Sequence, residues 1–520
     1  MRHSPRPVAA CPLDVQRQME HSTLVNARIG EEDFVDTLNT SLFRTIEQMK
    51  LGVGYHNVGT GVLRASNKAT IDYVEDHYGQ RCGHLPLDAQ RVCVFVNAHN
   101  DENVLHLKYL SRLYGKEIQA ITPIELRQHQ KRFSPSQMMI VPYINVPETE
   151  RRIQTDLGAE SWGINGEMVN LLKNKADFYQ FIDDFEFDGF RTPDYRIAQI
   201  SDVSNEALDF LNTIEDVVKK AGVSQYPLGV MMRAAESDGN YGCSLVYEQH
   251  KRVRVVPNGE VEHAIYYSSW KEALAVSQKH LAATMDLQKE TRIVISRYID
   301  MVDSPGMSVV IMDGRIESLG WNGQLQQNGS KACIGTSTYR PANASLARLQ
   351  HTYEKQTLAY FEAILRQAAQ KCGVDFASIR GVANIDIMLP SDLEELLQKN
   401  RGHKLAHYVA ECNPRWTNYT DAIMTIIGVN RKKQTINNMK AVIQEGIATF
   451  DKYYMPEDVD AQVVRECIFQ RDEVLSQSGT RIICRMAKKP MGLIFAGDIN
   501  KAQQEVASIV NILNTVNMRK

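Results

Sequence analysis

Two segments near the C-terminal end of the chain carry oxygen ligands in a pattern that suits a divalent cation. Asp386 lies in the apolar run 381–388, and Glu411 and Asn413 follow the apolar residues 408–410. Side chains alternate along a strand, so Glu411 and Asn413 are expected on one face. Mg²⁺ prefers hard oxygen ligands, commonly one or two carboxylates together with phosphate oxygens. The three side chains therefore predict a Mg²⁺ site, at which Mn²⁺ is an alternative.

A cation follows these ligands directly. Arg415 stands just beyond Pro414, and a guanidinium in that place can reach the phosphates that the metal holds. Each of these polar residues alone would more often be a turn former or a solvated side chain. Their combination within two short segments is what indicates a metal-nucleotide site.

An Asp on one strand, followed by Glu-x-Asn-Pro-Arg after the next, resembles the ATP-grasp superfamily. The resemblance covers roughly residues 90–500 and is nearest to amino-acid and peptide ligases with a pre-ATP-grasp N-terminal domain. It implies an α/β fold in which two α+β lobes sandwich ATP behind a Rossmann-like domain. We expect an irregular N-terminal region, a pre-ATP-grasp domain, an N-terminal or lid subdomain, and a C-terminal catalytic lobe with an extension, at residues 1–85, 86–160, 161–305 and 306–520.

Upstream segments match further parts of the family in order. The resemblance implies that Lys175 and Arg233 contact the α- and β-phosphates. The usual residue at the second position is Lys, but Arg occurs in the carbamoyl-phosphate synthetase branch and can hold phosphate bidentately. The loop 237–242 lies between two expected strands and would close over the γ-phosphate, although its sequence also suits an ordinary hairpin turn. Its proposed nucleotide contacts are Ser237, Gly239 and Gly242.

The segment 292–299 stands where the family has the hinge that reads adenine. Ser296 takes the place of the usual hinge carboxylate, so the resemblance implies that main-chain groups near Tyr298 and Ile299 read the base. Asp303 is either a ribose contact or a turn residue beside Ser304-Pro305-Gly306. Beyond an expected hairpin at 308–320, Arg340 is the candidate contact for a substrate carboxylate or acyl phosphate.

Composition agrees with a large enzyme of several lobes. The chain has 520 residues, with 59 Lys and Arg against 62 Asp and Glu, and its formal charge of -3 argues against a dedicated nucleic-acid binder. Nine cysteines without metal-ligand spacing fit reduced thiols. Residues 1–21 lack the apolar core of a secretory signal and no apolar run is long enough to span a bilayer, so we expect a cytoplasmic protein without a membrane partner.

The alternation of strands and helices from residue 91 predicts a parallel sheet. Strands are expected at 92–96, 118–122 and 138–144, with a helix at 102–114. The glycines between 52 and 61 miss the dinucleotide-binding spacing and predict a loop. A helix over 351–371 is expected to end at Gly373, and the tail 481–512 to form two strands and a helix.

The resemblance implies an ATP-dependent carboxylate-amine ligase. Such an enzyme forms an amide through an acyl phosphate, releases ADP and phosphate, and takes a small carboxylate (an amino acid or short peptide) and an amine as partners; a homodimer is a further expectation. Two other interpretations stay open. One is a non-catalytic ATP-binding regulator or scaffold of the same fold, and the other is an enzyme resembling carbamoyl-phosphate synthetase or a carboxylase.

Overall fold

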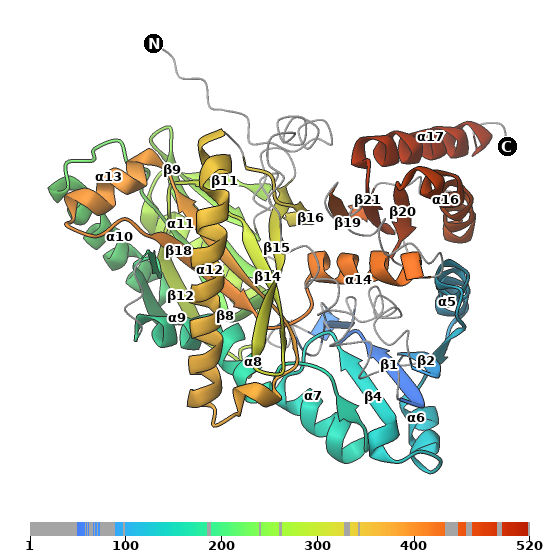
Figure 1. Ribbon diagram of the computed structural model, residues 1–520. Coiled ribbons are helices and arrows are strands. Elements are labelled where there is room, and N and C mark those ends of the chain that lie inside the picture. The colour runs from blue at the N-terminus through green and yellow to red at the C-terminus, as the bar shows by residue number, and fades with distance from the viewer. Residues whose placement is uncertain are drawn as a thin grey trace.

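The described residues of the chain form three sheets with helices packed around them (Figure 1). The computed structural model describes residues 49–57, 59, 61, 66, 68–69, 71–72, 89–96, 99–184, 189–238, 241–258, 263–326, 333–341, 344–431, 446–453, 460–485 and 491–517.

The first sheet is wholly parallel and confirms the sheet predicted from the alternating pattern. Its strands run in the order β3-β2-β1-β4-β5. These strands are β1 (Leu51–Tyr55), β2 (Arg91–Phe95), β3 (Ile118–Ile121), β4 (Met138–Pro142) and β5 (Glu160–Ser161). Helices α5 (Asp101–Tyr114), α6 (Pro123–Gln130) and α7 (Pro147–Arg151) connect them. Asn100 caps α5, and Thr122 and Glu125 form a capping box on α6, so each helix begins where its sequence signals a start.

The loop predicted around the first glycines is wrong, because Leu51–Tyr55 is the central strand β1. Gly52 and Gly54 fall on one face of this strand, while Leu51, Val53 and Tyr55 on the other face join a buried cluster. A central parallel strand is buried on both sides and shows no polar alternation. Two glycines in five residues further weaken the strand signal.

The second sheet is antiparallel, and together with its helices we call it the six-stranded lobe. Its order is β11-β10-β9-β8-β12-β7. The strands are β7 (Tyr195–Gln199), β8 (Gly229–Asp238), β9 (Tyr241–Gln249), β10 (Arg252–Pro257), β11 (Ile265–Tyr267) and β12 (Arg292–Arg297). Helices α10 (Val203–Lys220) and α11 (Trp270–Thr284) bury their apolar faces with these strands in a second buried cluster.

The third sheet forms the ten-stranded lobe. Its path is β20-β21-β19-β16-β15-β14-β17-β18-β6, with β13 paired to β17. The strands are β6 (Phe190–Arg191), β13 (Met301–Asp303), β14 (Gly306–Met312), β15 (Arg315–Gln326), β16 (Cys333–Thr338), β17 (Gly381–Pro390), β18 (His407–Asn413), β19 (Ile447–Tyr453), β20 (Arg481–Cys484) and β21 (Met491–Ala496). The hairpin of β14 and β15 and the strand-strand-helix order of the C-terminal tail match the sequence prediction.

Helices of this part of the chain cover the ten-stranded sheet and join it to its neighbours. They are α8 (Gly166–Lys173), α9 (Lys175–Asp183), α12 (Ala344–Lys371), α13 (Asp392–Asn400), α14 (Asn418–Arg431), α16 (Ala461–Leu475) and α17 (Ile499–Asn517). The long helix α12 runs across the sheet in Figure 1, and Gly373 follows its end with a positive φ of 66°, as predicted. Two α+β lobes therefore follow a parallel α/β domain, and the predicted fold class is confirmed.

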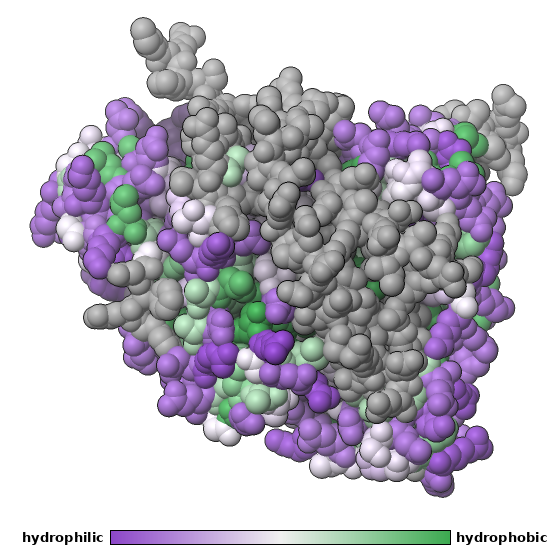
Figure 2. All heavy atoms as spheres, viewed as in Figure 1, coloured by the Kyte–Doolittle hydropathy of each residue, from purple (hydrophilic) through white to green (hydrophobic). Residues whose placement is uncertain are grey.

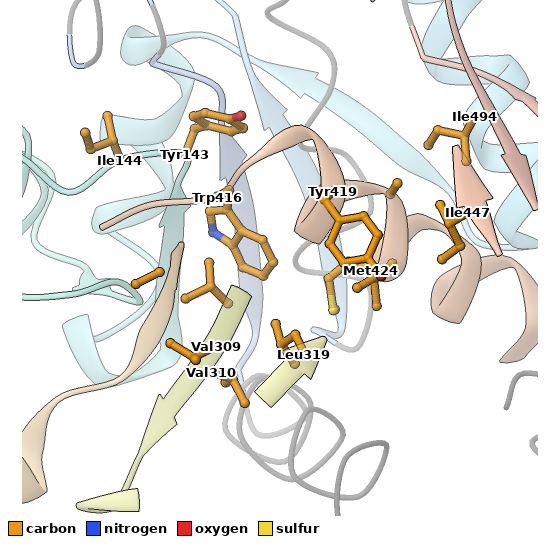
Figure 3. Packing of buried hydrophobic residues seen from close by; sticks show 14 of the residues in the cluster. Tyr143, Ile144, Val309, Val310, Leu319, Trp416, Tyr419, Met424, Ile447 and Ile494 are labelled. Atoms are coloured by element: carbon orange, nitrogen blue, oxygen red, sulfur yellow. The ribbon is translucent and has the colours of Figure 1, made fainter. Parts of the chain in front are cut away.

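One continuous core joins the parallel domain to the ten-stranded lobe. Figure 3 shows the indole of Trp416 between Tyr143 and the strand that carries Val309 and Val310, with Tyr419 of α14 beyond it. Trp416 also stacks on Trp162, with ring centroids 5.4 Å apart. The residue next to Arg415 is thus anchored by apolar side chains from distant parts of the chain.

The coloured surface on the face in Figure 2 is mostly hydrophilic, with smaller apolar patches. Within the described part of the chain, none of the helices combines the length and the apolar character needed to cross a bilayer.

Candidate active site

The two predicted metal carboxylates lie opposite each other on neighbouring strands. Asp386 of β17 pairs with Glu411 of β18, and Asn384 pairs with Asn413 in the same antiparallel ladder. The amide nitrogen of Asn413 lies between the two carboxylates, 3.0 Å from Asp386 Oδ2 and 3.4 Å from Glu411 Oε1. The sheet register therefore brings together the three side chains that were expected to bind metal.

The donor set fits a hard cation. An amide N–H group now lies between the two carboxylates, which is where positive charge is favoured, and the Asn413 oxygen accepts a hydrogen bond from Arg415 at 3.0 Å. Rotation of this amide would offer its oxygen on the side of the carboxylates, and two carboxylates plus one amide oxygen suit Mg²⁺. Among the described residues no cluster of three or more His, Cys, Asp and Glu side chains could hold a metal. The candidate site thus depends on the asparagine as its third ligand.

Cations from separate elements surround Glu411. Lys175 Nζ lies 3.2 Å and Arg233 Nη1 lies 3.6 Å from Glu411 Oε2. Burial alone would raise the pKa of this carboxyl group, but Lys175 and Arg233 outweigh it and lower the pKa from 4.5 to about 2. The Glu411 carboxylate is therefore ionised at neutral pH and ready to bind a cation.

A buried network fixes Lys175 at the start of α9. The side chain of Asn174 caps this helix and donates hydrogen bonds to Glu236 at 3.0 Å and Glu290 at 3.2 Å. Lys173 forms a 2.7 Å ion pair with Glu236, and both side chains are buried. Lys175 itself also donates to the carbonyl of Ser237. The lysine thus links the end of β8 to Glu411.

Arg233 is held against Tyr179 of α9. Its Nη2 atom donates to the tyrosine hydroxyl at 2.6 Å, and this hydroxyl donates to the carbonyl of Ala410 at 2.9 Å. Ala410 directly precedes Glu411 on β18. The arginine predicted to bind phosphate therefore lies beside the predicted metal ligands, although β8 belongs to the other lobe.

Arg415 lies on the side of Asn413 away from the carboxylates. Its guanidinium donates to the Asn413 amide oxygen at 3.0 Å and to the Trp416 carbonyl at 2.9 Å, above the ring of Tyr143. Because Trp416 is buried in the shared core, the backbone that carries Arg415 is fixed. The guanidinium can thus act as a positioned charge next to the metal ligands.

The expected phosphate loop 237–242 lies where β8 pairs with β9 as a hairpin. Gly242 has a φ of 70°, a left-handed conformation that favours glycine, and Ser237 contributes its carbonyl to Lys175. Gly239 lies outside the described residues. The three nucleotide contacts expected here remain predictions.

The expected hinge joins β12 to β13. Ser296 is buried and donates to the carbonyl of Met231 at 3.4 Å, the main-chain N–H of Tyr298 donates to the Gly229 carbonyl at 2.9 Å, and Ile299 is buried. The Tyr298 ring stacks on Tyr247, 5.8 Å away between centroids. These contacts fix the segment between the lobes. That its main-chain groups bind adenine remains a prediction.

Asp303 and Arg340 lie further along the ten-stranded lobe. Asp303 accepts hydrogen bonds from its own turn, at Ser304 N, and from the Tyr339 hydroxyl at 3.0 Å. These partners suit the turn interpretation, and the ribose contact stays a prediction. Arg340 follows β16, and burial lowers the pKa of its guanidinium. Its role toward a substrate also stays a prediction.

Sequence reasoning missed a layer of polar residues behind Asp386. Asn384 donates to Asp386 Oδ1 at 2.7 Å, and the Ser308 hydroxyl lies 3.0 Å from the Asn384 oxygen and 3.1 Å from that of Asn322. All three are buried on the adjacent strands β17, β14 and β15. The two-residue spacing from Asn384 to Asp386, which puts both on one face, was the only local signal.

Comparisons with known proteins give matches only at the level of structure. No family model matches the chain, and no curated protein does. Similar solved structures include N5-carboxyaminoimidazole synthase from Aspergillus clavatus in complex with ADP, at 11% identity and a TM-score of 0.47, covering 90% of this chain and 100% of that one. Biotin carboxylase from Campylobacter jejuni has 11% identity and a TM-score of 0.43, with 87% and 88% covered. D-alanine–D-alanine ligase from Bacillus anthracis has 13% identity and a TM-score of 0.35, with 74% and 99% covered.

These matches assign no role to any residue of this chain. Its own topology consists of a parallel domain followed by two α+β lobes, with two carboxylates, an amide and three cations gathered where the lobes meet. The chain therefore has the arrangement that its sequence led us to expect, a parallel α/β domain followed by two α+β lobes.

Proposed function

We propose that this protein is an ATP-dependent carboxylate-amine ligase of the ATP-grasp type, acting on a small acid such as an amino acid or short peptide. One observation carries the proposal. Asp386 and Glu411 face each other across β17 and β18, with Asn413 between them and Lys175, Arg233 and Arg415 around them. Two carboxylates and one amide oxygen amid three fixed cations suit a metal-bound polyphosphate.

Each charged side chain of the site would have its own role in phosphoryl transfer. Lys175 and Arg233 would hold the α- and β-phosphates. Arg415 would stabilise the negative charge on the γ-phosphoryl group as this group passes to the substrate carboxylate. Mg²⁺, held by Asp386, Glu411 and Asn413, would neutralise phosphate charge. Phosphoryl transfer depends on such positioning and charge neutralisation and needs no covalent protein nucleophile. An amine would then displace phosphate from the acyl phosphate, which leaves an amide, ADP and phosphate.

The test is a substrate screen with ATP and Mg²⁺. Pooled carboxylates are incubated with pooled amines, products are identified by mass, and ADP and AMP are measured separately. In a parallel arm hydroxylamine replaces the amine and should trap the activated acid as a hydroxamate. Stoichiometric AMP with pyrophosphate would contradict the proposed γ-phosphoryl transfer.

Two further arms separate the alternatives. Bicarbonate as the only acid tests a carboxylase-like or carbamoyl-phosphate-like reaction. Tight ATP binding without turnover in every arm would favour the regulator, whereas the absence of ATP binding would overturn the nucleotide site itself.

A further inference from the structure

The connection between the two strands that carry the metal ligands contains a helix that packs into the other lobe. Helix α13 lies between β17 and β18, yet its Leu397 belongs to the buried cluster of the six-stranded lobe. Asn400 at the end of α13 donates to the carbonyl of Ala221, which follows α10, at 2.8 Å. Figure 1 shows the orange α13 among the green elements of that lobe.

A fully buried ion pair joins α13 to β12. Arg297 donates from Nη1 to Glu394 Oε2 and from Nη2 to Glu394 Oε1, both at 2.8 Å. The side chains are 1% and 0% exposed. The hydroxyls of Tyr226 and Tyr408 also donate to the Glu394 carboxylate, the second at 2.5 Å.

The remaining donors of Arg297 are also occupied. Its Nε donates to Asp194 at 3.0 Å, and Asp194 accepts a second hydrogen bond from Arg401 at 2.7 Å. Two arginines thus face two carboxylates, so the network is neutral in total charge. It joins β12, α13, β18 and the segment before β7 at one point.

Main-chain hydrogen bonds also join the hinge segment to β17, the strand that carries Asp386. The Ser391 main-chain N–H donates to the Asp300 carbonyl at 3.0 Å, and the Ile387 N–H donates to the Pro305 carbonyl at 3.0 Å. Between these points Met301 pairs with Pro390 in the β13–β17 ladder. The hinge segment and the strand of Asp386 are therefore bonded along their length.

Stability alone is a weak reason for this pair. Replacement of a buried ion pair by apolar side chains of similar size is often neutral or stabilising, because desolvation offsets the Coulombic gain. What the charged pair supplies is fixed bidentate geometry. Arg297 stands between Ser296 and Tyr298 of the expected base-reading hinge. Tyr408 belongs to β18, which carries two of the expected metal ligands, and α13 connects β18 to β17.

We propose that Arg297 and Glu394 are positioning residues that set the distance between the nucleoside end and the phosphate end of the nucleotide site. The inference rests on the proposed function, since a nucleotide must span both ends. Both side chains are buried, so the proposed role needs no contact with the nucleotide. The pair acts by holding the hinge to the strands of Asp386 and Glu411.

The experiment uses the full chain with both residues replaced, R297M/E394M. The matched control is R481M/D472M, because Arg481 and Asp472 form another buried ion pair, with hydrogen bonds of 2.8 and 2.5 Å, in the C-terminal part of the chain. Calorimetry measures binding of MgATP, adenosine and magnesium tripolyphosphate to each protein. A second set replaces the double variant if that does not fold: R297K keeps a cation but loses the planar bidentate fork, and E394Q keeps the shape of the side chain but removes its charge.

A positioning role predicts a selective loss. MgATP affinity should fall by about tenfold or more in R297M/E394M, while adenosine and tripolyphosphate keep their affinities. MgATP joins the two fragments in one molecule, and the extra affinity from joining them requires that their two sites are correctly spaced. The control should bind all three like wild type. Unchanged MgATP affinity, or an equal loss for all three ligands, would overturn the proposal.

Hydrogen exchange without nucleotide separates this inference from the proposed function. In R297M/E394M, amides of residues 381–389 should exchange faster than in wild type, and the control should leave them unchanged. Unchanged exchange there would overturn the proposed coupling. A wild-type protein that binds no ATP would refute the proposed function, while the exchange result would still decide whether the pair holds β17.

Discussion

At the scale of single residues, the carboxylates of Asp386 and Glu411 give the most direct test. Asp386→Asn or Glu411→Gln removes one charge from the predicted metal site and keeps the side-chain shape. Turnover should fall by about 10³-fold or more, as for loss of a charge clamp in phosphoryl transfer. ADP release measures the effect, and circular dichroism checks the fold. Turnover like that of wild type in either variant would refute the metal assignment.

The charge environment of Glu411 also predicts a pH dependence of stability. Its pKa falls from 4.5 to about 2 in the folded protein. The ionised group therefore contributes stability that is complete above about pH 4.5 and is lost as pH falls toward about 2. The difference in unfolding free energy between wild type and Glu411→Gln should shrink over that range. A difference that stays constant with pH would contradict the proposed ion pairs with Lys175 and Arg233.

Lys175 should affect phosphate binding and leave nucleoside binding unchanged. Lys175→Met keeps the apolar stem but removes the charge that pairs with Glu411 at 3.2 Å. ATP affinity should weaken by about 1.5 to 3 kcal/mol, the range for hydrogen bonds to charged groups. Adenosine serves as the control ligand, and the exposed Lys219 offers a control position. Equal losses for ATP and adenosine would mean that Lys175 is structural.

The sequence indicated which residues of the candidate site would lie together, but not the residues around them. Asp386, Glu411 and Asn413, which were expected to act together, do lie together, and Lys175 and Arg233 lie beside them. Asn322 and Ser308 could not be found, because they reach the site only through the pairing of β15, β14 and β17. Which strands lie side by side is decided by contacts between segments far apart in the sequence, and local patterns do not show it.

At the scale of elements, Gly306 on β14 should be intolerant of a side chain. A Cβ there would lie 2.6 Å from Asp386 Oδ1, 2.7 Å from Asn322 Nδ2 and 2.9 Å from Asn384 Oδ1. Gly306→Ala should therefore displace Asp386. Turnover and the apparent affinity for Mg²⁺ should then fall together, in a protein that still folds. Gly323→Ala on β15 is the matched control, since its nearest contact is an ordinary 3.5 Å. Equal activity of the two variants would show that Asp386 need not stay in place.

Elements with a strong local pattern were predicted, and those defined by their neighbours were not. Helix α5 and the hairpin of β14 and β15 carry caps, apolar periodicity or a tight turn in their own sequence. Strand β1 was predicted as a loop because a glycine-rich central strand has no alternation. Helix α13 begins at a Ser391 cap, yet only the fold reveals that it packs into the six-stranded lobe.

At the scale of the whole molecule, the shared core makes the parallel domain and the ten-stranded lobe one unit. Trp416 lies at its centre and is buried against groups from both. Trp416→Ala should cost about 3 to 5 kcal/mol, the range for aromatic truncation in a core. Denaturant unfolding measures the loss, and hydrogen exchange should show it in β4 and β17 together. Loss of protection in β17 alone would mean that the two parts unfold separately.

The meeting of the lobes could not be deduced from local patterns. Strand β6 pairs in parallel with β18, far along the chain, while β7, only a few residues later, pairs with β12. Such choices depend on the whole three-dimensional packing, and resemblance to a family supplied the expectation of two lobes.

The chain crosses between the two lobes over very short segments. Residues 192–194 separate β6 from β7, and residues 298–300 separate β12 from β13. A link of this length can extend to only about 14 Å between the Cα atoms at its ends. The crossings lie side by side, since the Arg297 N–H donates to the Asp194 carbonyl at 2.8 Å. The lobes can therefore separate at this edge by no more than the short links allow, and a wider opening elsewhere is a rotation about the paired crossings.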